Sequence, residues 1–60
     1  MDKEKIRKQI LSHLTWAWHY RLFMHHYYTM GNRNLATNSR KCYTDHVHMA
    51  CRLGRQLRSM

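Results

Sequence analysis

Apolar and aromatic side chains recur every three or four residues along the first half of the chain. Alternating steps of three and four are typical of the face with which a long helix packs against another helix. Asp2 is suited to cap such a helix, and Glu4 would lie in its first turn, where the helix dipole favours an acid. The pattern predicts a helix over residues 3–28. Its packing seam is Ile6, Ile10, His13, Ala17, Tyr20, Met24 and Tyr27.

A similar spacing runs through the second half and predicts a helix over residues 35–58. Between the two helices, residues 29–34 form a turn, in which Gly31 suits the left-handed conformation that ends many helices. Asn34 and Asn38 are alternative caps for the second helix, so the loop has six or ten residues. The second seam is Ser39, Cys42, His46, Met49, Leu53, Gln56 and Met60, broadened by Tyr43, Ala50 and Leu57.

The fold class predicted from these two helices is all-α: a two-helix antiparallel hairpin forming a single domain over residues 1–60. The absence of proline and the presence of only two glycines fit helices and argue against a turn-rich β fold. Folding about the turn places Tyr20 opposite His46. The same register places Ala17 opposite Met49, and small against large is a favourable packing.

The first helix carries more apolar surface than one partner helix can cover. A second stripe follows Leu11, Leu14, Trp18, Leu22 and His25, and two further aromatic residues lie on another side. A helix that is apolar nearly all round is normally buried on most sides. We therefore expect two hairpins to form a homodimeric four-helix bundle, and the alternative is a hairpin that folds on a different protein. The predicted dimer or partner interface is Leu14, Trp16, Trp18, Leu22 and Phe23.

Because the chain is short, its stability depends more strongly on such an assembly. A domain of 60 residues buries only about 60% of the surface of its unfolded chain. Disulfides, metals or oligomerisation usually compensate for so small a core. Cys42 and Cys51 cannot form a disulfide within one helix, because about 13.5 Å of helix axis separates them. Oligomerisation is the expected compensation.

Positive charge is the most informative functional feature. The chain has 11 Lys and Arg against three Asp and Glu, a formal net charge of +8. Much of this charge lies on the side of the second helix away from its seam. An unbalanced positive surface attracts polyanions such as nucleic acid or an acidic protein, although a solvated outer face is the simpler alternative. The predicted basic face is Arg40, Lys41, His48, Arg52, Arg55 and Arg58.

The histidine and cysteine content suggests a zinc site, but the spacing does not support one. A continuous helix places Cys51 about 180° around the axis from Cys42, so one ion cannot bind both. His25 or His26 together with Cys42 and His46, across the hairpin, is the remaining geometric alternative. The favoured interpretation is that these side chains belong to the seam or the surface. No metal and no cofactor is predicted.

An enzyme is not predicted either. Asp45 could pair with His48 or His46, and Cys42 could act as a nucleophile. Catalytic groups need orientation by a preorganised pocket, however, which a two-helix chain does not provide. Asp45 is better placed as the i+4 partner of Lys41.

The pattern of apolar residues predicts neither a signal peptide nor a transmembrane segment. The most apolar stretch, residues 14–30, contains Arg21 and three histidines, whereas a spanning helix needs about 20 mostly apolar residues. A cytoplasmic protein is expected. Aromatic residues lie on one helix and most charges on the other, which argues against a single helix lying in a membrane interface.

Two histidines, His13 and His46, occupy seam positions. A charged imidazolium is costly to bury, so stability should fall as the pH drops below about 6.5, where free histidine takes up a proton.

The basic opening MDKEKIRKQI, the short chain and the helix–GNRN–helix plan resemble small early-region proteins of lambdoid temperate phages. The plan is also similar to that of the Rop family of plasmid regulators, which are dimers of helical hairpins that bind RNA. The phage resemblance implies a non-enzymatic accessory protein that alters host physiology or lytic development. The expected function is a regulatory binding protein that acts through the basic face, with nucleic acid as a partner. The alternative is an adaptor or inhibitor that binds a host protein through the aromatic residues of the first helix.

Overall fold

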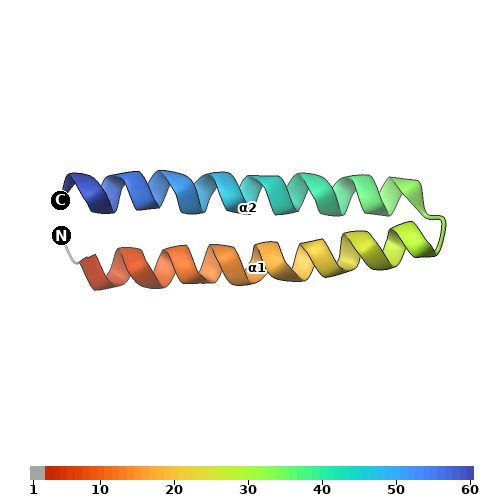
Figure 1. The fold of residues 1–60 in the computed structure, drawn as a ribbon, viewed down its shortest axis with the longest axis horizontal. Coiled ribbons are helices and arrows are strands. Elements are labelled where there is room, and N and C mark those ends of the chain that lie inside the picture. The colour runs from red at the N-terminus through yellow and green to blue at the C-terminus, as the bar shows by residue number, and fades with distance from the viewer. Residues whose placement is uncertain (1–2) are drawn as a thin grey trace.

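The computed structural model describes residues 3–60 and contains two antiparallel helices joined by a tight turn (Figure 1). Helix α1 spans Lys3–Thr29 and helix α2 spans Arg33–Ser59, with 27 residues each. The two helices lie side by side along their whole length, so the start of α1 and the end of α2 lie at the same end of a rod of 45 × 13 × 11 Å. The all-α two-helix hairpin is thereby confirmed.

The turn consists of Met30, Gly31 and Asn32, and its backbone hydrogen bonds define how α1 ends. The N–H of Asn32 donates to the carbonyl of Tyr27 at 2.9 Å, and the N–H of Gly31 donates to the carbonyl of Tyr28 at 3.1 Å. This pair of bonds is the Schellman arrangement, which requires a left-handed residue after the helix. Gly31 supplies it with φ 78°.

Helix α2 is capped by Asn32 rather than by Asn34 or Asn38. The Asn32 Oδ1 accepts a hydrogen bond from the N–H of Leu35 at 3.2 Å. The turn is therefore shorter than residues 29–34, because Asn32 completes the end of α1 with its backbone and starts α2 with its side chain. Asp2, the expected cap of α1, lies outside the described residues.

The predicted seam of α1 is confirmed, since all seven of its residues are buried or half-buried and Ile6 and Ala17 are each only 3% exposed. The predicted seam of α2 is partly wrong. Met49 is 47% exposed and Gln56 and Met60 are exposed as well. The other predicted residues of α2 are buried or half-buried, including Cys42 and the three residues that broaden the seam, Tyr43, Ala50 and Leu57. The observed seam therefore lies toward one side of the predicted one and runs through Ala36, Ser39, Tyr43, His46, Ala50, Leu53 and Leu57.

Small side chains dominate the buried part of the interface. Ala17, Ala36, Ser39 and Ala50 are buried together with Ile6, and no large side chain among residues 3–60 is fully buried. Small residues let two helices approach closely, and the larger side chains then pack at the margins of the contact. The predicted pairing of small Ala17 with large Met49 is not supported, because Met49 is 47% exposed, and the small buried residues of α2 are Ala36, Ser39 and Ala50.

The turn yields a test of the observed register. Asn32→Ala removes the side-chain acceptor for the Leu35 N–H and should lower the free energy of unfolding by about 1 kcal/mol. In thermal melts followed by circular dichroism, a loss of that size lowers the midpoint by roughly 4–8 °C in a domain of this length.

Asn34→Ala and Asn38→Ala are the matched controls for this change. Both residues lie inside α2, where alanine is the better helix former, so stability should stay equal or rise slightly. A larger loss in either control than in Asn32→Ala would show that the turn has been assigned to the wrong residues.

Candidate functional site

The outer surface of α2 carries the predicted basic face, and all six of its residues are exposed. At about 100° per residue, four of them lie on the side of α2 opposite the buried Ser39 and Ala50, whereas Arg40 and Arg58 lie at the edge of the face nearer to Ala36. Arg33 at the start of α2 lies on the same side and extends the basic face to the turn. Asp45 is the single acidic residue of α2 and lies at the margin of this face.

The outer surface of α1 carries the predicted apolar interface. Its five residues are exposed to between 46% and 58%: Leu14, Trp16, Trp18, Leu22 and Phe23. Large apolar side chains that remain exposed to this extent are typical of an interaction surface. We call these five residues the apolar face.

The apolar face has two flanks, one on each side of the seam. At about 100° per residue, Trp18 and Leu22 point to one flank while Trp16 and Phe23 point to the other. On the second flank, the Tyr20 ring lies 6.2 Å from both the Trp16 and Phe23 rings, edge-on to Phe23. The aromatic side chains thus form a continuous row along the margin of the hairpin.

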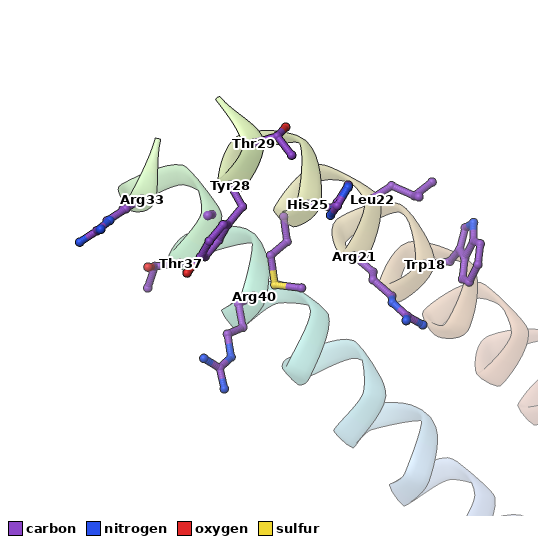
Figure 2. A pocket seen from close by; sticks show the side chains of 11 residues that line it. Trp18, Arg21, Leu22, His25, Tyr28, Thr29, Arg33, Thr37 and Arg40 are labelled. Carbon is purple, nitrogen blue, oxygen red and sulfur yellow. The ribbon is translucent and has the colours of Figure 1, made fainter. Parts of the chain in front are cut away.

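An open groove with a volume of about 1040 Å³ lies near the turn, on the Trp18 flank. Figure 2 shows Trp18 and Leu22 on α1, the Tyr28 ring between the two helices, and Arg33 and Arg40 extending from α2 away from α1. We call this the turn groove. It joins the apolar face to the basic face, because Trp18 and Leu22 belong to the first and Arg40 to the second.

Two arginines of the turn groove were not predicted as site residues. Arg21 places its guanidinium carbon 5.9 Å from the centre of the Trp18 ring, a cation–π contact, and Arg33 lines the α2 side. The lining contains no aspartate or glutamate. Arg21 and Arg33 are far apart in sequence, and only the fold about Gly31 brings them to one groove. Sequence spacing therefore gave no signal for this combination.

A histidine pair joins the two helices near the middle of the hairpin. The Nδ1 atoms of His13 and His46 are 3.0 Å apart, and both side chains are half-buried. The Tyr20 ring stacks on His46 with 5.7 Å between centroids and an angle of 15°. One Nδ1 donates its proton and the other accepts it, so the pair needs at least one acceptor nitrogen.

Within residues 3–60, no group of three or more His, Cys, Asp or Glu side chains is placed to share a metal ion. The three-ligand alternative of His25 or His26 with Cys42 and His46 is therefore not formed. Cys42 is half-buried and Cys51 exposed, both as free thiols.

Neither helix of the described chain is long and apolar enough to cross a lipid bilayer. In comparisons with known proteins, no family model, no curated protein and no solved structure matches this chain.

The histidine pair predicts that the hairpin loses stability in acid. If both imidazoles are protonated, both Nδ1 atoms carry hydrogen, and the pair changes from attractive to repulsive. This repulsion acts in the folded hairpin, where the two Nδ1 atoms are 3.0 Å apart, and not in the unfolded chain, where the rings are separated, so stability should fall in acid. Thermal melts at about pH 7.5 and about pH 5 should show the loss.

The double variant His13→Leu with His46→Leu isolates this effect from the general charge of the chain. It removes both members of the pair and fills the seam with apolar groups, so its midpoint should depend less on pH than that of the wild type. His48→Asn changes an exposed histidine and should keep the wild-type dependence. An equal acid loss in the double variant would assign the effect to overall repulsion.

Proposed function

We propose that this chain is a small non-enzymatic regulatory protein that binds a polyanion, nucleic acid, through the basic face of α2. The observation that carries the proposal is the excess of positive charge on the outer surface of α2. The charge forms two groups, Arg33, Arg40 and Lys41 near the turn and Arg52, Arg55 and Arg58 near the end of the helix, with Asp45 between them as the one acidic residue. Solvated helix faces normally mix both signs of charge in comparable numbers. Six positive residues against one acid on a 27-residue helix instead favour the phosphates of a nucleic acid backbone.

The length and straightness of α2 support this proposal. A helix of 27 residues extends for about 40 Å, which exceeds one turn of duplex DNA or reaches across several nucleotides of a single strand. Arg52, Arg55 and Arg58 recur every three residues and so drift slowly around the helix, as a backbone contact requires. The phage accessory role implied by the sequence resemblance is part of the same proposal.

Assembly through the apolar face of α1 is the second part of the proposal. The basic face and the apolar face lie on the outer sides of different helices, so two hairpins can pack through α1 while each leaves its α2 surface in solvent. A four-helix bundle of two hairpins would bury Trp18 and Leu22, which are now 58% and 52% exposed.

The runner-up function is an adaptor or inhibitor that binds a host protein through the same aromatic residues. The exposed Trp16, Trp18 and Phe23 favour it, because tryptophan and other large aromatic side chains dominate the binding energy of protein interfaces. In this case the basic face contributes long-range attraction only.

Nucleic acid binding is tested by the variant Arg52→Ser, Arg55→Ser and Arg58→Ser. For the wild type, the logarithm of affinity for duplex DNA or RNA should fall steeply with the logarithm of salt concentration, by about 0.9 per phosphate contacted. Removing three contacts should reduce this slope by roughly 3 and weaken binding by orders of magnitude at low salt. Fluorescence anisotropy with labelled oligonucleotides measures both quantities.

The matched control is Lys3→Ser, Lys5→Ser and Lys8→Ser, which removes the same charge from α1 at the same end of the hairpin (Figure 1). It should keep most of the salt slope. Equal losses in both variants would mean that overall charge, not the basic face, drives binding. Protein capture that survives nuclease and needs Trp16 or Trp18 would favour the runner-up.

Assembly is tested by sedimentation at micromolar concentration. The wild type should sediment as twice the 7.4 kDa chain, whereas Leu14→Lys with Leu22→Lys should sediment as a monomer, since both changes put charge into the apolar face. Met30→Lys is a control, because Met30 is also exposed, at 66%, but lies in the turn. A well-folded wild-type monomer would contradict this part of the proposal.

A further inference from the structure

We propose that the histidine pair is a metal site, in which the Nδ1 atoms of His13 and His46 hold one divalent ion of the zinc class between α1 and α2. The inference is independent of the proposed function. It rests on the convergence of two metal-ligating side chains from different helices.

The distance between the two nitrogens is close to the distance between two nitrogen ligands of one tetrahedral zinc ion. Two imidazole nitrogens at 2.0–2.1 Å from zinc, at a tetrahedral angle, are about 3.3 Å apart. The observed Nδ1–Nδ1 distance is 3.0 Å, so the rings need to separate by only a few tenths of an ångström. In the metal-bound form the proton of each neutral ring lies on Nε2, and both Nδ1 lone pairs are free to bind the ion.

The surroundings give the ion access and leave room for further ligands. Both histidines are half-buried rather than sealed. An open groove of about 420 Å³ lies beside His13 and is lined by Ser12 and Met49 among other side chains. Water in this groove can complete the coordination that two protein ligands leave open. Arg52 also lines the groove, and its charge opposes a second cation, so we expect modest affinity.

The Tyr20 ring restrains the site from one side. It stacks on His46 with an angle of 15° between the rings, which holds the imidazole in the orientation that faces His13. A ligand that needs little reorganisation loses little entropy on binding. An ion held by both rings also joins the helices across the seam, so it stabilises the folded hairpin and not the unfolded chain.

The test is the thermal midpoint of the wild type with and without Zn²⁺, in a buffer that does not bind metal and at fixed protein concentration. Free zinc at about a hundredfold excess over its Kd should raise the midpoint by roughly 10–20 °C, and a chelator should reverse the rise. His13→Asn and His46→Asn should each abolish it. His25→Asn and His48→Asn, which change exposed histidines, should keep it.

Cysteine thiolates bind zinc as well, so the rise should also persist in Cys42→Ser with Cys51→Ser. A second measurement covers the case in which a seam variant fails to fold. In the wild type, Zn²⁺ should shift the imidazole NMR signals of His13 and His46 together and leave those of the exposed histidines nearly unchanged. Absence of a midpoint rise in the wild type, a rise that survives His13→Asn, or equal shifts at all six histidines would each overturn the proposal.

Discussion

Close contact between two helices along a seam of small residues is the constraint on which the rest of this molecule depends. Ala17 on α1 and Ala36, Ser39 and Ala50 on α2 are buried, and they let the backbones approach. A seam of this kind removes little apolar surface from water, because alanine and serine have little to bury. The large side chains lie at the margins or on the outer side of α1, where one partner helix cannot reach them. The apolar face and the marginal stability of a lone hairpin therefore share one cause.

The seam also decides which residues form the two outer surfaces, the apolar face of α1 and the basic face of α2. Because α2 covers only one side of α1, the tryptophans and Leu14 and Leu22 remain exposed. The outer side of α2 carries arginines and a lysine, with Asp45 as the one acidic residue of that helix, and it would remain in solvent in the proposed assembly. The turn groove is where the two surfaces meet, with Arg40 and Trp18 in one lining. The histidine pair lies within the seam itself and adds a polar contact between the helices.

The helical hairpin and the seam of α1 could be predicted from spacing alone, because steps of three and four repeat without interruption through seven positions, from Ile6 to Tyr27. The seam of α2 could be predicted only in part, because two neighbouring faces of that helix both carry such steps, one through Met49, which is exposed, and one through Ala50, which is buried. The choice between them depends on the register, and the register depends on Asn32 serving both helix ends in a three-residue turn. For the same reason, sequence spacing could not predict that Arg21 and Arg33 line one groove or that His13 contacts His46.

We infer that one hairpin is an incomplete folding unit whose apolar face requires a cover. The most direct measurement is the thermal midpoint of the wild type across a hundredfold range of protein concentration. If two hairpins fold as one bundle, mass action makes the midpoint rise steadily with concentration. A cooperative transition whose midpoint is the same at every concentration would show that the hairpin is stable alone, and it would contradict the account.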